Sequence, residues 1–340
     1  MARIFIDGFE SGSMDLWDQN YVLSGSKSVV TTPVIVNTYC LSIPSGSGYL
    51  KKYLPGDPEY YLAYKFRFHA FPVHWSVMGG FWDVSDIYQV SWGISNAGQV
   101  KVYKGQFGYG TLLASGPNLT YDKNYLIEIH VVVSQTVGVF QMKVDSILVI
   151  DLSAIDTMGS VGVANINYLA IGSADYASTV TTVSFGQYID DVIVDDAAWV
   201  GNTKIQAIWP TGVGNSSQWT PLAGSNYANV DEIPYSDADY ISTNTVNMVD
   251  TYVYSDLLDT PSAILCVQPQ ARIILEGTPT PLNLSVVTRI SGSDYVSSVY
   301  LPPTTNYQSR YHNWPLSPAT TAQWGVAEVN NAEFGIKSIT

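Results

Sequence analysis

The stretch from Tyr121 to Leu152 constrains the fold most, because it reads as three consecutive antiparallel strands. In its first arm, apolar residues alternate with Glu128 and His130. The apolar positions are Tyr125, Ile127, Ile129, Val131 and Val133. This period of two is typical of a half-buried strand. The arm at 139–144 repeats the alternation, and Asp145-Ser146 then turns the chain into an apolar run at 147–150. A sheet with one apolar face must be covered by another layer, so the stretch predicts a β-sandwich.

In the rest of the first half, Gly, Pro and Ser recur at short intervals, and the apolar residues show almost no 3.6-residue periodicity. Short strands are expected at 29–36, 49–53, 60–68, 76–82, 88–94 and 100–104, and GYGTLLASG at 108–116 reads as a hairpin loop. FGQYIDDVIVD at 185–195 is expected to close the domain as a strand, with one face formed by Tyr188, Asp190, Val192 and Val194. We predict a first β-sandwich domain over residues 1–198.

The composition shifts toward Asn, Thr and Pro from Gly201 onward. Strands are expected at 204–209, where Pro210 should stop the strand, and at 249–254, 263–275, 282–290, 295–301, 306–312 and 334–339. One short helix near the C-terminus is predicted at 321–329, ended by Asn330-Asn331. The second half is therefore predicted to be a second β-sandwich over residues 199–340, which makes the chain all-β.

The charge pattern excludes several classes of partner. The formal net charge is −14 and the pI is near 4.4, whereas nucleic-acid phosphates require clustered Lys and Arg, so no nucleic-acid partner is expected. No apolar run suits a membrane span and the start of the chain lacks a signal-peptide pattern, so no membrane partner is expected. Charged residues make up only 13% of the chain and Tyr occurs 24 times, which suits contacts with other protein copies. Cys40 and Cys266 lie in apolar strand contexts and are predicted to be buried free thiols.

In chain order, the first half contains the segments DGFESG, GYLKKYLPGDPEYYLAYKFRF, YQVSWGISNAGQVKVYKG, LIEIHVVV, MKVDSILVIDLS and IDDVIVDD. Their order and spacing resemble the concanavalin A-like (laminin G-like) jelly roll. The second half contains WPTGVGNSSQWTPLAGSNYANVDE, DTYVYSDL and NWPLSPATTAQWGVAEVNNAEFGIK. These segments resemble C-terminal domains of structural proteins of tailed bacteriophages. Together the two resemblances imply a virion component.

The sequence predicts no catalytic residue. Glycoside hydrolysis needs two carboxylates that flank the scissile bond, and the family pattern of alternating Glu and Asp is missing. Glu128 stands alone between two isoleucines, and Glu328 and Glu333 straddle the end of the predicted helix. We interpret these three as exposed or edge carboxylates.

No metal or other cofactor is predicted either. Six carboxylates could supply oxygen ligands for calcium, but the spacing of a dedicated calcium loop is missing; they are Asp83, Asp86, Asp190, Asp191, Asp195 and Asp196. We expect Asp190 and Asp191 to bind neighbouring backbone amides instead. The four histidines are too scattered for a zinc site: His69, His74, His130 and His312.

One aromatic cluster could contact a ligand, because aromatic faces stack on sugar rings. We take Trp75, Trp82, Tyr88 and Trp92 as candidate glycan-contacting residues. Packing inside the sandwich core is the favoured alternative for these side chains.

The sequence favours a non-enzymatic structural protein of a tailed-phage virion, made in the host cytoplasm and located on the exterior of the head, neck or tail. The leading hypothesis is a capsid decoration or cement protein. Its expected partners are further copies of itself in a closed homo-oligomer, for example a trimer, and other virion proteins such as the major capsid protein. The alternative is a neck or tail-fibre receptor-binding protein whose first domain binds glycans, and a glycan-degrading enzyme is the third hypothesis.

Overall fold

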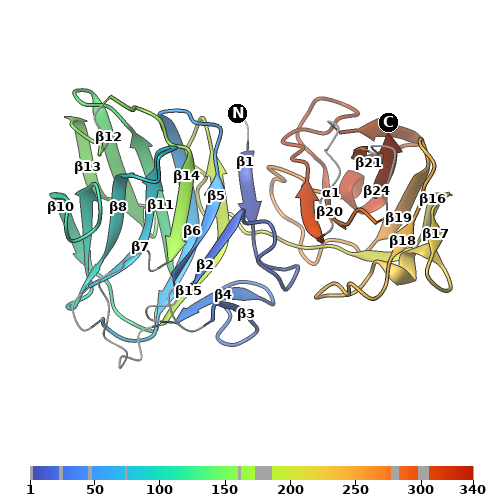
Figure 1. The fold of residues 1–340 in the computed structure, drawn as a ribbon, viewed down its shortest axis with the longest axis horizontal. Coiled ribbons are helices and arrows are strands. Elements are labelled where there is room, and N and C mark those ends of the chain that lie inside the picture. The colour runs from blue at the N-terminus through green and yellow to red at the C-terminus, as the bar shows by residue number, and fades with distance from the viewer. Residues whose placement is uncertain are drawn as a thin grey trace. The chain divides into compact units, whose positions relative to one another are not determined.

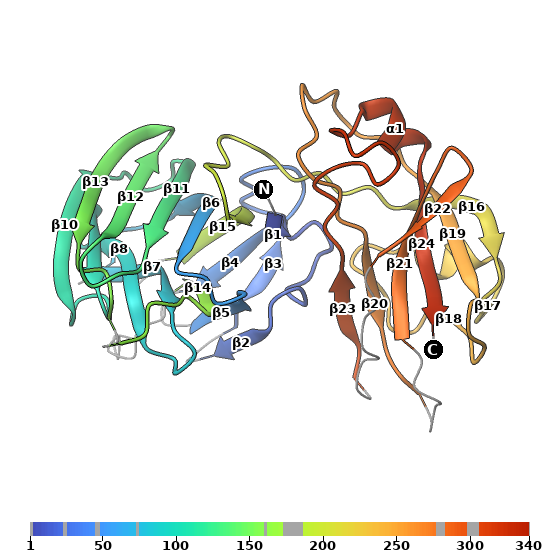
Figure 2. The ribbon, with the colours of Figure 1, turned by 90° about the horizontal axis from the view of Figure 1, so that it is seen from above.

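The computed structural model describes residues 3–22, 26–44, 48–72, 75–159, 162–172, 186–276, 283–297 and 306–339. Contacts divide the chain into two units, Met1–Ile205 and Gln206–Thr340, whereas the sequence predicts a boundary after residue 198. Over the described residues, the prediction of an all-β chain with one short α-helix near the C-terminus is confirmed (Figures 1 and 2).

The first unit contains two antiparallel sheets. The first sheet has the strand order β13-β12-β11-β6-β15-β4-β3, and β1 also pairs with β15. Its strands are β1 (Arg3–Asp7), β3 (Ser28–Val30), β4 (Cys40–Pro44), β6 (Glu59–Phe68), β11 (Tyr125–Val132), β12 (Gly138–Val144), β13 (Ile147–Ile155) and β15 (Gly186–Asp195). The second sheet has the order β10-β9-β8-β7-β14-β5-β2. Its strands are β2 (Gln19–Val22), β5 (Gly48–Tyr53), β7 (Trp75–Trp82), β8 (Tyr88–Ser95), β9 (Gln99–Lys104), β10 (Thr111–Asn118) and β14 (Tyr168–Gly172).

The predicted three-stranded meander is present as β11, β12 and β13, which pair in sequence. The apolar positions on one face of β11 and β12 are buried, since Ile127, Ile129 and Phe140 have no exposed surface, whereas Ile147 and Leu148 at the start of β13 are exposed. From the second sheet, Trp92 enters the same core and donates a hydrogen bond from Nε1 to the Tyr64 hydroxyl over 2.9 Å. The period of two therefore identified the core face of this sheet correctly.

The predicted alternation of the closing strand is wrong at one point. A bulge interrupts the pairing of β15 with β6 between Asp190 and Ile193, and Asp191 has a φ of 48°. The extra residue reverses the alternation. Ile189 lies opposite Phe66 before the bulge and Val194 lies opposite Leu62 after it, so Val192 and Val194 share the face of Ile189. Asp190 consequently does not share a face with Val192.

The segment at 108–116, predicted as a hairpin loop, is only partly a loop. Its second half begins the edge strand β10, whose Thr111 pairs with Lys104. Pairing with a neighbouring strand has overridden a local composition that is rich in glycine.

The second unit is built on a five-stranded antiparallel sheet of order β16-β19-β24-β21-β22, with two-stranded ladders β17-β18 and β20-β23. The strands are β16 (Pro210–Ser217), β17 (Thr220–Pro221), β18 (Ile241–Ser242), β19 (Val249–Tyr254), β20 (Gln270–Ile273), β21 (Asn283–Ile290), β22 (Ser293–Val296), β23 (Gln308–Tyr311) and β24 (Glu333–Ile339). The helices are the 3₁₀ turn η1 (Asn226–Asn229) and α1 (Val326–Asn331). Its buried cluster comprises Ile290, Trp324, Val329, Ala332 and Phe334.

Two boundary predictions in this unit are wrong. No strand forms at 204–209, and Pro210 begins β16 instead of ending a strand. This is tolerated because β16 is an edge strand, where a missing N–H costs no ladder bond. The helix begins at Val326, five positions after the predicted start, because Trp324 forms an isolated β-bridge with Ile264.

Both cysteines are free thiols, as expected, although Cys266 is only partly buried. Burial raises the pKa of Cys40 to about 12. Among the described residues, no helix has the length and apolar character needed to cross a membrane.

Candidate functional site

The outer face of the second sheet carries a group of aromatic side chains that strand register brings together. Tyr168 pairs with Trp82 on one side and with Tyr53 on the other, while Ala170 pairs with Lys51. Directly paired residues project to the same side of an antiparallel sheet. We call this surface the aromatic face and define it as Tyr21, Tyr49, Tyr53, Trp82, Tyr88 and Tyr168 around Lys51.

The rings of the aromatic face form two groups of contacts, which Lys51 connects. The centroids of Tyr53 and Tyr168 are 4.4 Å apart, those of Tyr49 and Trp82 are 5.2 Å apart, and those of Tyr21 and Tyr49 are 4.9 Å apart. Lys51 connects the two groups, because its Nζ lies 3.6 Å from the Tyr168 centroid and 4.6 Å from the Trp82 centroid. Tyr53 and Tyr21 are 54% and 42% exposed, so each group includes a ring that reaches solvent.

Lys51 is the centre of this arrangement and is 1% exposed. Its ammonium group is paired with the carboxylate of Asp86, which is 59% exposed and lies in the turn between β7 and β8. A buried lysine requires such compensation, and here the rings and one carboxylate provide it.

The hydroxyls of Tyr49 and Tyr168 remain protonated near neutral pH. Burial raises the pKa of Tyr49 to about 12. The hydrogen bond to Tyr53, in which Tyr168 donates over 2.8 Å, raises the pKa of Tyr168 to about 12. These groups can therefore both donate and accept hydrogen bonds.

The four aromatic residues singled out from sequence separate in the structure. Trp82 and Tyr88 belong to the aromatic face, with centroids 4.4 Å apart. Trp75 lies at the other end of β7, where its ring contacts Phe107 and the 63% exposed Tyr109. Trp92 is fully buried in the core and presents no face to solvent.

Most of the aromatic face is missing from the sequence-based candidates, which did not include Tyr21, Tyr49, Lys51, Tyr53 or Tyr168. A signal was present in the segment YLKKY, whose alternation places Tyr49, Lys51 and Tyr53 on one side of β5. The contributions of β2 and β14 depend on strand order, which the sequence alone does not contain.

Of the aspartates considered as calcium ligands, Asp190 and Asp191 bind backbone amides, as expected. Asp190 accepts the N–H groups of Val36 and Asp191, and Asp191 accepts the N–H of Ile205. Elsewhere, Asp83 accepts the N–H groups of Ser85 and Ile87, while Asp195 accepts those of Ala197 and Ala198. Within the described ranges, no three His, Cys, Asp or Glu side chains are grouped to hold a metal ion.

The described histidines have separate partners. His69 Nδ1 lies 2.9 Å from Asp122, whereas His130 Nε2 lies 2.8 Å from Glu59 and its ring stacks on Tyr61. His312 packs against Trp314 in the second unit. His74 lies outside the described residues.

The expectation that Glu128 is an exposed or edge carboxylate is wrong. Glu128 is 2% exposed, since the chain after β15 crosses the outer face of the first sheet there. Its Oε1 accepts the N–H of Gly201 over 2.9 Å. Trp199 in the same segment packs edge-on against Tyr61 and His130. Glu128 therefore holds this segment on the sheet.

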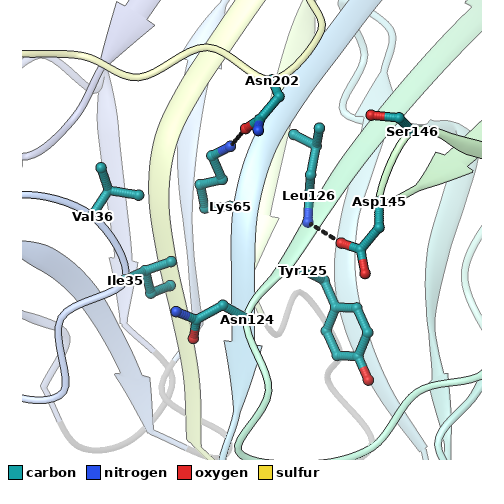
Figure 3. A pocket seen from close by; sticks show the side chains of 9 residues that line it. All are labelled: Ile35, Val36, Lys65, Asn124, Tyr125, Leu126, Asp145, Ser146 and Asn202. Carbon is teal, nitrogen blue, oxygen red and sulfur yellow. Dashed lines mark hydrogen bonds between the residues drawn. The ribbon is translucent and has the colours of Figure 1, made fainter.

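A polar cavity of about 330 Å³ lies beside this segment in the first unit (Figure 3). Lys65 and Asn202 point toward each other in it, and the Lys65 ammonium donates to Asn202 Oδ1. Asn124, Asp145 and Ser146 supply further polar groups, and the remaining lining is Ile35, Val36, Tyr125 and Leu126.

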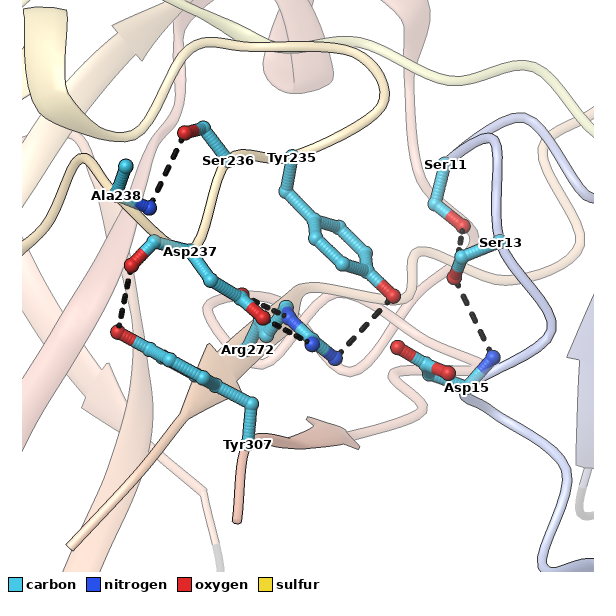
Figure 4. A network of polar contacts seen from close by, with 9 residues as sticks. All are labelled: Ser11, Ser13, Asp15, Tyr235, Ser236, Asp237, Ala238, Arg272 and Tyr307. Atoms are coloured by element: carbon cyan, nitrogen blue, oxygen red, sulfur yellow. Dashed lines mark hydrogen bonds and ion pairs between the residues drawn. The ribbon is translucent and has the colours of Figure 1, made fainter.

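The second unit contains a compact polar cluster around Arg272 on β20 (Figure 4). Its guanidinium forms a bidentate pair with Asp237 at 2.6 and 2.7 Å and donates to the Tyr235 hydroxyl. The Tyr235 and Tyr307 rings lie 4.2 and 5.0 Å from the guanidinium carbon. These contacts fasten the loop that contains residues 235–237 to the β20-β23 ladder.

Two stacked antiparallel sheets, in which many neighbouring strands are not consecutive in the sequence, define the first unit as a β-sandwich of the jelly-roll type. No protein-family model and no curated protein matches the chain. Among solved structures, it is similar to the alginate lyase Aly36B at 16% identity, over 48% of this chain and 83% of that one, with a TM-score of 0.37. It is also similar to the cellulose induced protein Cip1 at 13% identity, over 60% and 99% of the two chains, with a TM-score of 0.42. A Trypanosoma rangeli sialidase is similar at 12% identity, over 50% of this chain and 27% of that one, with a TM-score of 0.35.

Proposed function

We propose that the first unit binds a polysaccharide on the aromatic face. The observation that carries this proposal is the arrangement of ring contacts around Lys51, which ends in the exposed rings of Tyr53 and Tyr21. The apolar C–H faces of sugar rings pack on aromatic rings, and sugar hydroxyls pair with tyrosine hydroxyls. Tyr49, Trp82 and Tyr168 are only 9%, 6% and 6% exposed, so the exposed rings of Tyr21 and Tyr53 would make the main contacts. Two separated rings suit an extended glycan better than a single sugar.

The test compares variants of the full chain in affinity electrophoresis through gels that contain different polysaccharides. Tyr53→Ala and Tyr21→Ala should reduce retardation, because each removes an exposed ring and leaves the core intact. Tyr121→Ala is the matched control, since Tyr121 is 52% exposed and lies outside the aromatic face. If no polysaccharide retards the wild type, or if the control loses as much binding as Tyr53→Ala, the proposal is wrong.

We also propose that the chain binds glycan without cleaving it. Neither carboxylate in the turn next to the aromatic face is free to act on a bound glycan, since Asp86 pairs with Lys51 and Asp83 is fully buried, with its Oδ1 accepting two backbone N–H groups. Glycoside hydrolysis requires an acid and a base or nucleophile free to act on the bond. Release of shortened sugars from a bound polysaccharide would contradict this part of the proposal.

We propose that the setting of this binding is the exterior of a tailed-phage particle. The support is the resemblance of the second half of the sequence to C-terminal domains of tailed-phage structural proteins, joined to a concanavalin A-like first half, together with the low charge and high tyrosine content. The test is quantitative mass spectrometry of purified particles from the encoding genome. A copy number that matches the capsid lattice supports a decoration protein, a few copies support a neck or tail receptor-binding protein, and absence from the particle contradicts both.

A further inference from the structure

The cavity beside Lys65 is lined by polar groups and lies apart from the aromatic face. Lys65 lies on β6 in the first sheet, whereas the aromatic face belongs to the second sheet. Lys65 is half-buried, and no carboxylate in the described part of the chain lies within ion-pairing distance of it. Its ammonium binds the neutral amide oxygen of Asn202. The carboxylates of Asp191, Asp190, Glu128 and Asp145 stabilise this ammonium from a greater distance, but none is in contact with it, so an anion in the cavity could bind it directly.

The two asparagines of the cavity present N–H groups to it. Lys65 donates to Asn202 Oδ1, and Arg67 donates to Asn124 Oδ1 over 3.4 Å. In each amide the oxygen accepts a hydrogen bond, so the other terminal atom is the nitrogen Nδ2, which can donate. Neither Nδ2 group, nor the hydroxyl of Ser146, has a hydrogen-bond partner among the described residues.

The carboxylate in the lining, Asp145, does not supply a free acceptor. Its Oδ1 accepts the N–H of Leu126 over 3.0 Å, and its Oδ2 lies 3.2 Å from Lys123 Nζ. The cavity therefore offers one cation and three uncommitted donor groups, while its acidic group is occupied. The side chains of Ile35, Val36 and Leu126 give the same cavity an apolar wall.

Two further carboxylates lie near Lys65 on β15. Asp190 is its partner in strand register, and Asp191 follows. Both are buried, and burial raises their pKa to about 9 and about 7, so their negative charge is reduced near neutral pH. Their oxygens accept the backbone N–H groups described above, and an anion in the cavity would meet little repulsion from them.

We propose that this cavity binds a small sugar acid, with its carboxylate against the Lys65 ammonium and the Asn124 and Asn202 amides. The ring C–H groups would pack on Ile35, Val36 and Leu126, and the ring hydroxyls would meet Ser146. The volume of about 330 Å³ falls in the range of small-molecule sites. This site is independent of the aromatic face and does not require it to bind glycan.

The experiment titrates the full chain with D-glucuronate, D-glucose and acetate by isothermal calorimetry. D-glucuronate should bind at one site. D-glucose and acetate should bind at least about tenfold more weakly, since D-glucose lacks the carboxylate and acetate lacks the sugar ring. Equal binding of D-glucose would overturn the role of the carboxylate. Equal binding of acetate would overturn the assignment to a sugar acid.

Variants separate this cavity from other surfaces. Lys65→Met keeps the aliphatic stem and should weaken D-glucuronate by about tenfold or more, because a charge-assisted bond is lost. Lys101→Met is the control, since Lys101 has no ion pair among the described residues and does not line the cavity. Asn202→Ala supplies a second test if Lys65→Met lowers the melting temperature. Unchanged D-glucuronate affinity in both folded variants, or equal loss in Tyr53→Ala, overturns the proposal.

Discussion

The ammonium group of Lys51 lies 3.6 Å from the centre of the Tyr168 ring, on a side chain that is 1% exposed. Its carboxylate partner, Asp86, is 59% exposed, so the two members of this ion pair differ in how much water they retain. Removing the carboxylate leaves a buried cation, whereas removing the cation leaves a carboxylate that water can solvate. This asymmetry makes the order of two mutational effects predictable.

We expect Asp86→Asn to lower the free energy of unfolding more than Lys51→Met does. Lys51→Met loses cation–π attraction worth about 1–2 kcal/mol but keeps the packing of the stem. Asp86→Asn leaves Lys51 without its carboxylate, at a cost of about 2–4 kcal/mol. Asn also suits the φ of 62° at this position, so backbone strain does not confuse the comparison. Urea unfolding of both single variants and of the double variant measures the order, and a larger loss in Lys51→Met would contradict it.

Trp92 gives a second prediction, because it is a core residue. Trp92→Leu should lower stability by about 3–5 kcal/mol, through lost volume and the unpaired Tyr64 hydroxyl. Tyr64→Phe removes the same hydrogen bond without a large cavity and should cost about 1–2 kcal/mol. Polysaccharide binding by the folded fraction of Trp92→Leu should equal that of the wild type. A stable Trp92→Leu protein that no longer binds glycan would place Trp92 at the binding surface after all.

The different positions of Trp82, Tyr88 and Trp92 show where sequence patterns stop being informative. In the sequence, Tyr88 has the same parity as Val90 and Trp92. The pairing of β7 with β8 shifts between Phe81 and Trp82, so that Trp82 faces Tyr88 while Phe81 faces Val90. A bulge of one residue thus turns Tyr88 outward and leaves Trp92 in the core. Because a bulge depends on the partner strand, the local pattern cannot reveal it.

The meander from β11 to β13 was predictable because its signal lies in the local sequence. Its strands are consecutive, and in β11 and β12 the period of two and the turn residues fix both pairing and burial. In β13, Ile147 and Leu148 are 67% and 45% exposed, and its pairing with β12 contains two register shifts. The aromatic face and the cavity at Lys65 combine residues from strands and loops far apart in the chain. Asn202 and Lys65, for example, meet only because the segment after β15 folds back over the first sheet, where Glu128 holds Gly201.

In the second unit, we expect Arg272→Lys to loosen the loop around Asp237. Lysine cannot form the bidentate pair with Asp237, and it stacks less well than arginine on Tyr235 and Tyr307. The expected loss is about 1 kcal/mol, because Asp237 is 45% exposed and the pair is screened by solvent. Hydrogen exchange of residues 231–240 should become faster. Arg289→Lys is the control, since Arg289 donates a single hydrogen bond to Asp294, and faster exchange of that loop in the control would contradict the assignment.

The raised pKa of Asp191 predicts how the stability of the protein depends on pH. Burial raises the pKa of Asp191 to about 7, and its Oδ2 has no hydrogen-bond partner among the described residues. In the unfolded chain the pKa of an aspartate is about 3.9, so between about pH 4 and 7 the folded state binds a proton that the unfolded state does not. The stability from this group is therefore fully present below about pH 4 and is lost as the pH rises through about 7. Burial also raises the pKa of Asp190 to about 9, so the loss of stability continues as the pH rises toward 9.

Asp191→Asn should remove this contribution. The amide oxygen can still accept the N–H of Ile205, and asparagine tolerates the φ of 48° at this position. Relative to the wild type, its free energy of unfolding should rise by about 1–3 kcal/mol between pH 5 and pH 8. Asp191→Ala, which removes the hydrogen bond as well, should show the same change with pH on a lower baseline. Urea unfolding at pH 5, 6.5 and 8 measures all three proteins. A wild type and Asp191→Asn whose stabilities run parallel across this range would show that Asp191 stays ionised in the folded state, and the raised pKa would be wrong.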